Sequence, residues 1–254
     1  MPASVKVRIL GVGMGPQHVT PEVAEALRSA DYVLAAEKSD DDPLLALRRD
    51  IVRAHPGPHG EVEVLAVRDP VRDRSAGLDT GGYETAVTDW HAARAAAYAE
   101  ILRERGGTAA FLVWGDPSLY DSTIRIVDKI RELGIDLEYD VLPGISAPQL
   151  LAARHRIVLH EVGRPVHVTT GRRLQEAVSG GLDNIVAMLN PPPQRLDLTG
   201  LQDWTIWWGA NLGAAGEQLV AGRVEDVLPA ITDARAAAQA RDGWVMDLFL
   251  VRKA

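Results

Sequence analysis

Three apolar, strand-like runs of this chain each end in a loop that contains glycine, and this repeated arrangement constrains the fold more than any other feature. The runs cover Val5 to Val12, Ala109 to Trp114 and Leu137 to Leu142, and the loops cover residues 11–16, 115–122 and 143–147. Open α/β sheets bind ligands in loops at the carboxyl ends of their strands. The three loops therefore predict one shared ligand-binding cleft.

Helical patterns lie between the strand-like runs of the first half. Thr20 offers an N-cap ahead of Pro21, and Glu84 to Arg105 reads as a long helix. Two further short apolar runs, Tyr32 to Ala36 and Val62 to Val67, suit parallel strands. This alternation predicts an α/β domain with a mostly parallel sheet and helices on both faces.

Strands cluster rather than alternate in the second half, so we expect a mixed α+β domain there. The expected strands are Val166 to Thr169, Ile185 to Leu189, Thr205 to Trp208 and Trp244 to Arg252, with a helix at about Val224 to Ala240. The pattern restarts after the loop at 116–122, which predicts domains at 1–118 and 119–254 with a cofactor cleft between them.

Composition excludes several classes of function. The chain has no cysteine, which rules out disulfides and thiolate chemistry, and its seven histidines show no metal-ligand spacing, so we expect no metal. A net charge of −8 argues against a nucleic-acid partner. The longest apolar run, Ala109 to Trp114, is far short of the ~20 residues that a membrane span needs. With no secretory pattern at the N-terminus, we expect a cytoplasmic protein.

The first glycine loop has more than one interpretation when it is taken alone. Its spacing is G-x-G-x-G-P rather than the dinucleotide-binding G-x-G-x-x-G, yet Glu37 lies about where a ribose-binding acid would stand. A nicotinamide-dependent oxidoreductase is therefore one alternative. A plain strand–turn–helix in a protein that binds a ligand or partner without catalysis is another.

All three loops in this order and spacing resemble the tetrapyrrole (precorrin) methyltransferases. The resemblance covers essentially the whole chain and implies two α/β domains, with S-adenosylmethionine bound between them and S-adenosylhomocysteine as the product. It also implies a homodimer, for which Trp207-Trp208 or Trp90 offers an aromatic anchor unless these residues are buried in the core. The positions matching cofactor-binding ones are Pro16, Gly115, Asp116, Leu119, Ser146, Ala147, Met188 and Gly213.

Further segments resemble one branch of this family, which acts in aerobic cobalamin biosynthesis. They are Arg68 to Arg74, Trp90 to Arg94, Trp114 to Thr123, Ala152 to Ile157 and Thr169 to Leu174. The resemblance implies methylation of precorrin-5 at C-1 with release of acetate to give precorrin-6A. Another precorrin methyltransferase with a different target carbon is the alternative within the family. A catalytic-type acid of the uroporphyrinogen branch would align near Ala36, but Glu37-Lys38 follows here, so that role is not transferred.

The implied substrate carries many carboxylates, and 23 of the 27 basic residues are arginine. Arginine forms a bidentate fork with carboxylates that lysine cannot form. We expect Arg68, Arg72 and Arg172 to bind substrate; the alternative is solvated surface arginines paired with acids such as Asp69.

Methyl transfer itself requires positioning rather than a protein nucleophile. Removal of the acetyl group by water would gain from a general base, for which His91 and Glu37 are the candidates. Alternatively, the substrate itself drives acetyl loss.

Overall fold

The structure is a computed structural model that describes residues 5–70, 80–191 and 196–253, the side chains of 80–84 excepted. Its chain divides into two compact units, Met1–Ile145 and Ser146–Ala254. The division lies later than the expected 118/119 boundary, because residues 119–145 supply a helix and a strand to the first unit. Each unit has its own sheet and core, which confirms the predicted two-domain α/β architecture.

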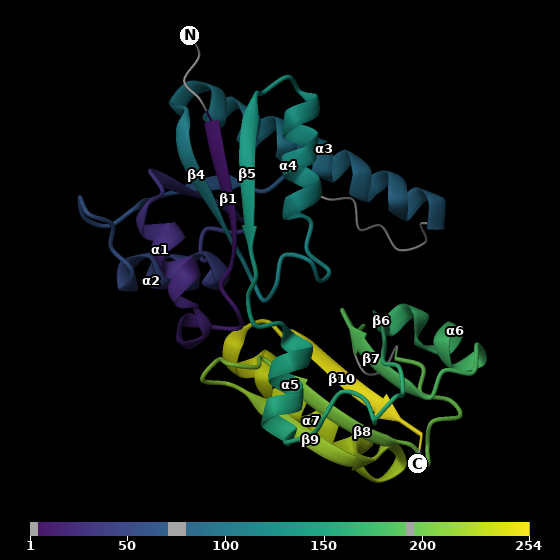
Figure 1. Ribbon diagram of the computed structural model, residues 1–254. Coiled ribbons are helices and arrows are strands. Elements are labelled where there is room, and N and C mark those ends of the chain that lie inside the picture. The colour runs from purple at the N-terminus through teal and green to yellow at the C-terminus, as the bar shows by residue number, and fades with distance from the viewer. Residues whose placement is uncertain (1–4, 71–79, 192–195, 254) are drawn as a thin grey trace. The chain divides into compact units, whose positions relative to one another are not determined.

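The first unit is built on a five-stranded sheet in the order β3-β2-β4-β1-β5 (Figure 1). Its strands are β1 (Val5–Gly11), β2 (Tyr32–Glu37), β3 (Glu63–Arg68), β4 (Gly107–Val113) and β5 (Leu137–Leu142). Every pairing is parallel: Ile9 of β1, for example, lies opposite Phe111 of β4 and Val141 of β5. The carboxyl ends of all five strands therefore lie at one edge of the sheet.

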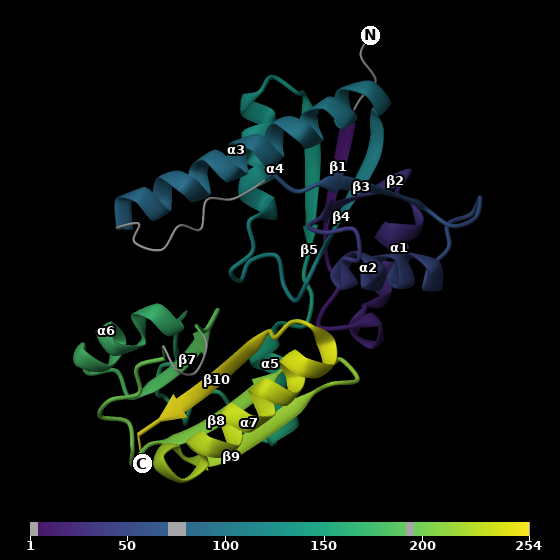
Figure 2. The same cartoon turned by 180° about the vertical axis from the view of Figure 1, so that it is seen from behind.

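Helices cover both faces of this sheet, as Figures 1 and 2 show from opposite sides. They are α1 (Pro21–Arg28), α2 (Pro43–Ala54), α3 (Thr80–Arg105) and α4 (Thr123–Glu132), with a short 3-10 turn, η1 (Pro16–His18). Alternate residues of a strand point to opposite faces. Accordingly, Val7 and Ile9 pack in the core under α3 and α4, whereas Leu10 packs in the core under α1 and α2.

Capping residues determine where two of these helices begin. The Thr20 hydroxyl accepts a hydrogen bond from the Val23 amide at 3.2 Å, ahead of Pro21, as expected. Asp42 caps α2 in the same way and accepts bonds from the amides of Leu44 and Leu45. The sequence analysis did not predict α2, although Asp42-Pro43 is a recognisable helix start.

The second unit contains a mixed sheet in the order β6-β7-β10-β8-β9. Its strands are β6 (His167–Thr170), β7 (Asn184–Met188), β8 (Thr205–Ala210), β9 (Gln218–Arg223) and β10 (Asp247–Arg252). Only the β6–β7 pairing is parallel. Because β7 and β8 both run antiparallel to β10, their carboxyl ends lie at the same edge of the sheet.

The helices of the second unit are α5 (Ala147–His155), η2 (Gly171–Arg173), α6 (Leu174–Ser179) and α7 (Val224–Asp242). Trp208 is 2% exposed and packs with Phe249 in the core, so it is a core residue rather than an anchor for a second chain. β9 and α6 were not predicted. None of the described helices is long and apolar enough to cross a membrane.

Candidate functional site

The loops that follow β1, β4 and β5 touch one another backbone to backbone. Gly13 and Gly115 exchange amide–carbonyl hydrogen bonds of 3.2 and 2.8 Å. A Cβ on Gly144 would lie 2.3 Å from the Gly115 carbonyl oxygen and 2.7 Å from the Gly11 carbonyl oxygen. Only glycine fits there. The three glycine-bearing loops thus form one unit at the carboxyl edge of the first sheet, as the sequence pattern predicts.

The Asp116 carboxylate links two of these loops by hydrogen bonds. One carboxylate oxygen accepts the Gly144 amide at 3.0 Å, and the other accepts the amide and hydroxyl of Ser118 at 2.9 and 2.5 Å. Burial raises the pKa of Asp116, but the hydrogen bonds from Ser118 and Gly144 outweigh burial and leave that pKa below its ordinary value. Because the folded-state pKa is lowered, these bonds contribute stability above the ordinary pKa of aspartate, and the contribution is lost as the pH falls through the lowered value.

The other expected cofactor residues of the first unit lie at the same edge. Pro16 is exposed and opens η1, directly after the first glycine loop. Leu119 is partly exposed, and its amide bonds to the Asp116 carbonyl at 3.1 Å. Pro16 and Leu119 thus offer apolar surface beside the Gly115 backbone.

In the second unit the expected residues also follow strands or begin a helix. Ser146 caps α5: both its amide and its hydroxyl donate to the Gln149 side-chain oxygen at 2.8 Å. Met188 ends β7, and Gly213 follows β8 with a φ of 80° and an amide bonded to Glu217 at 2.8 Å. Met188 and Gly213 therefore lie at one edge of the second sheet, while Ala147 is the first residue of α5.

Two of the three arginines expected to bind substrate, Arg68 and Arg172, belong to different units. Arg68 ends β3 with its side chain 62% exposed and pairs with Asp40 at 2.9 Å and with Glu37 at 3.8 Å. Arg172 is exposed in η2 of the second unit. Arg72 lies outside the described residues. Substrate binding by these arginines stays a prediction.

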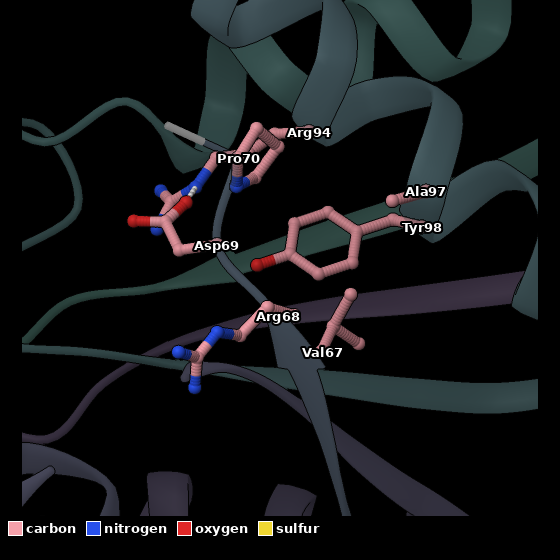
Figure 3. A pocket seen from close by; sticks show the side chains of 7 residues that line it. All are labelled: Val67, Arg68, Asp69, Pro70, Arg94, Ala97 and Tyr98. Atoms are coloured by element: carbon pink, nitrogen blue, oxygen red, sulfur yellow. Dashed lines mark hydrogen bonds and ion pairs between the residues drawn. The ribbon is translucent and has the colours of Figure 1, made fainter. Parts of the chain in front are cut away.

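Two of the segments singled out in the sequence meet at the end of β3 (Figure 3). Arg94 of α3 pairs with Asp69 at 2.6 Å, and both side chains are largely buried. The Arg94 guanidinium lies 4.2 Å from the centre of the Trp90 ring, and the Trp90 indole donates to the Pro70 carbonyl. A small pocket is lined by Val67, Arg68, Asp69, Pro70, Arg94, Ala97 and Tyr98. In Figure 3 the Tyr98 hydroxyl faces the Asp69 side of this pocket.

The two candidate bases lie in different surroundings. Glu37 ends β2 and is partly buried, with its carboxylate near Arg68. His91 is 8% exposed on α3, with its ring 5.2 Å from that of Trp90. The sequence analysis missed three groups that interact electrostatically with Arg94, namely Lys38, Arg48 and Tyr98. The predicted bases themselves stay untested.

Comparisons with known proteins show which family and which solved structures the chain is similar to. The family model for Tetrapyrrole (Corrin/Porphyrin) Methylases matches residues 6–228. A precorrin-6A synthase [deacetylating] of Sinorhizobium sp. is 42% identical over 254 residues, which cover 98% of this chain and 95% of the relative. The crystal structure of a putative cobalamin synthesis related protein (CobF) from Corynebacterium diphtheriae is 36% identical. It superposes with a TM-score of 0.81 and covers 98% of this chain and 99% of its own.

A more distant structure shares the fold. That protein, the cobalt precorrin-4 methyltransferase CbiF, is 19% identical, with a TM-score of 0.61 over 97% of this chain and 94% of its own.

Proposed function

The chain belongs to the tetrapyrrole (corrin/porphyrin) methylase family, and from that premise we propose that it is the methyltransferase that converts precorrin-5 to precorrin-6A. It methylates C-1 with S-adenosylmethionine as donor and releases the acetyl group as acetate. The relative of 42% identity that spans almost the whole of both chains carries this proposal. The cobalamin-related structure of 36% identity supports the same pathway.

The residues present fit the cofactor. Within each unit the expected binding residues lie at the carboxyl ends of strands or at the start of the helix that follows. The glycines of the loops have no side chain, so their backbone is accessible at these positions. The oxygens of Asp116 and the amide and hydroxyl of Ser146 are already engaged within the protein. Pro16, Leu119, Ala147 and Met188 would therefore hold the cofactor through apolar and backbone contacts, on loops that Asp116 and Ser146 shape.

Positioning accounts for most of the chemistry. When bound, the cofactor would supply a methyl group on a sulfonium. An electron-rich ring carbon of the macrocycle would bond to that methyl carbon in line with the carbon–sulfur bond, which would break and leave S-adenosylhomocysteine. The protein must hold the two carbons in contact and aligned, which by itself supplies about 7–11 kcal/mol of the barrier reduction in well-oriented reactions. Loops fixed by backbone contacts, such as those at Gly11, Gly115 and Gly144, suit this task because they cannot drift apart.

The remaining parts of the proposal rest on the family resemblance. They are a tetrapyrrole substrate bound through arginines, a homodimer, and action in the cytoplasm. Arg68 supports the first of these, because its exposed guanidinium stands at the carboxyl edge of the first sheet, the edge that carries the glycine loops.

Calorimetry distinguishes this proposal from the nicotinamide alternative. We expect S-adenosylhomocysteine to bind the purified protein with one site per chain and NADH to give no heat of binding. Adenosine serves as a control for recognition of the nucleoside alone. Tight binding of NADH without binding of S-adenosylhomocysteine would falsify the methyltransferase assignment.

A further inference from the structure

Leu189 directly follows β7, and its backbone lies in the left-handed region, with a φ of 50°. In that region the Cβ of an L-residue approaches the following carbonyl oxygen, so glycine is favoured and asparagine is the usual exception. Tyr120, Arg156 and Asn211 are the other non-glycine residues with a positive φ in the part of the chain that the structure describes. Leu189 is therefore the one aliphatic residue of that part with this conformation.

The left-handed turn directs the Leu189 side chain away from the core. Alternate residues of a strand share a face, and Ile185 and Ala187 of β7 are fully buried in the core of the second unit. A backbone that stayed extended would place the side chain of residue 189 on that same face. Instead, Leu189 is 62% exposed. The free protein thus holds a strained backbone at this residue without burying the leucine side chain in return.

The Asn190 side chain holds this turn in place. Its Nδ2 group donates to the carbonyl of Ala187 at 3.4 Å and to the carbonyl of Asp247, on β10, at 3.3 Å. The Asn190 Oδ1 atom is buried and accepts no hydrogen bond from the residues that the structure describes, which also costs stability. Strained backbone and unpaired buried polar atoms are concentrated at functional sites, where ligand binding offsets them.

A segment that carries an exposed arginine packs against the same turn. β6 pairs with β7 in parallel, with Thr170 opposite Met188, so η2 begins beside the end of β7 (Figure 1). A Cβ on Gly171 would lie 2.4 Å from the Asn190 Oδ1 atom, so only glycine allows this approach. The next residue, Arg172, is exposed. An exposed aliphatic side chain and an exposed arginine therefore follow neighbouring strands at one edge of the second sheet.

From this arrangement we infer that Leu189 binds the tetrapyrrole substrate through apolar contact with its ring system. The inference rests on the proposed function and names one residue of its substrate site. A tetrapyrrole with acidic side chains has apolar ring faces and carboxylates at its rim, which suits an aliphatic side chain with an arginine nearby. The adenine ring of the cofactor also has an apolar face, so the two ligands must be tested separately.

The expected signature is a residue that strengthens binding and weakens folding. The exposed part of the Leu189 side chain leaves water only when a ligand covers it, so this contact stabilises the complex and not the free protein. The strain of the left-handed backbone, in contrast, is present in both. Replacement of Leu189 by a residue that suits the turn should therefore stabilise the free protein and weaken its complex with the substrate.

Leu189→Gly tests this signature, because glycine relieves the strain and removes the side chain together. We expect the thermal unfolding midpoint of the free protein to rise by roughly 2–4 °C. The dissociation constant for precorrin-5, measured by anaerobic absorbance titration with S-adenosylhomocysteine present, should rise about tenfold, the lower end for loss of a buried leucine side chain. The KM for precorrin-5 should rise alike, while kcat stays within several-fold.

Two further variants complete the set. Leu189→Asn suits the left-handed turn but presents an amide, and it should weaken precorrin-5 binding as much as Leu189→Gly does. Leu133→Gly is the matched control. Leu133 is 47% exposed with an ordinary φ of −77°, and it precedes β5 at the amino edge of the first sheet. Its replacement should leave precorrin-5 binding unchanged and should not raise the unfolding midpoint.

Calorimetry with S-adenosylhomocysteine alone distinguishes the substrate from the cofactor. We expect its dissociation constant in Leu189→Gly and Leu189→Asn to stay within twofold of wild type. A tenfold loss of S-adenosylhomocysteine affinity with unchanged precorrin-5 binding would assign the contact to the cofactor and overturn the inference.

The remaining outcomes separate the inference from the proposed function. Precorrin-5 binding by Leu189→Gly within twofold of wild type, or a lowered unfolding midpoint in that variant, would overturn the role of Leu189 alone. If the wild-type protein neither binds nor methylates precorrin-5, the proposed function fails and the inference fails with it.

Discussion

Gly144→Ala should weaken binding of S-adenosylhomocysteine by about 100-fold and destabilise the first unit. The new methyl group would lie 2.3 Å from the Gly115 carbonyl oxygen and 2.7 Å from backbone atoms of Gly11, so rigid backbone blocks it on two sides. Overpacking typically costs about 1–3 kcal/mol, and we expect the upper end because no flexible side chain can yield. Thermal unfolding should show the midpoint lowered by roughly 6–12 °C, given about 2–4 °C per kcal/mol for domains of this size.

The loss of cofactor affinity should exceed what instability alone explains. Separating the loops by about 1 Å misplaces the groups that hold the cofactor, and misplacement on that scale can cost about 100-fold. Calorimetry below the melting temperature measures this directly.

Gly134→Ala is the matched control, since its Cβ would meet nothing within 4 Å and only its φ of 83° is strained. It should lose about 1–2 kcal/mol of stability and keep full affinity. Equal affinity in the two variants would contradict the role of the loop contacts.

Breaking the buried pair between Asp69 and Arg94 should produce the second large effect. Their side chains are only 11% and 14% exposed, and each single alanine variant leaves the other charge buried without its partner. Removing one partner of a buried pair costs about 3–5 kcal/mol, and Arg94→Ala also removes the stacking on Trp90. Denaturant unfolding should therefore show both single variants strongly destabilised.

The double variant distinguishes a coupled pair from two independent losses. We expect it to be less destabilised than the sum of the two single variants by about 0.5–3 kcal/mol, because it leaves no unpaired charge. The exposed pair of Arg53 and Asp50, with side chains 62% and 56% exposed, is the control and should lose no more than about 1 kcal/mol. Strict additivity at Asp69 and Arg94 would contradict the assigned ion pair.

Much of the fold could be predicted because its strands are apolar runs with clear ends. The expected strand from Val5 to Val12 is observed as Val5–Gly11, and Leu137 to Leu142 is observed without change. The domain boundary could not be predicted in the same way. It depends on β5 pairing with β1, more than a hundred residues earlier, and no local pattern shows that contact.

The helix α2 was missed for a different reason. Arg48 and Arg49 lie between its buried residue Leu45 and the buried pair Ile51 and Val52, and they hide the apolar periodicity. Arg48 is one of those arginines; its side chain is partly buried, and its guanidinium donates a hydrogen bond to the Leu112 carbonyl.

The candidate site likewise contains features that could be predicted from the sequence and features that could not. The loops at Gly11, Gly115 and Gly144 could be found from sequence, because each directly follows a strand. The surroundings of Lys38 could not, because Arg48 lies on α2, which was not predicted, and Arg94 lies on α3, far along the chain. Residue type and position suggested Glu37 and His91 as bases, but ion pairing and burial are properties that only the folded chain reveals.

One reaction tests the central proposal most directly. Purified protein is incubated with precorrin-5 and methyl-labelled S-adenosylmethionine, and the tetrapyrrole mass and free acetate are measured together. We predict one labelled methyl group gained, the acetyl group lost, and one acetate released per molecule of S-adenosylhomocysteine formed. A labelled product that keeps its acetyl group, with no acetate at any time, would show a methyltransferase of a different step. No label transfer to precorrin-5 under conditions where S-adenosylhomocysteine binds would contradict the assigned substrate.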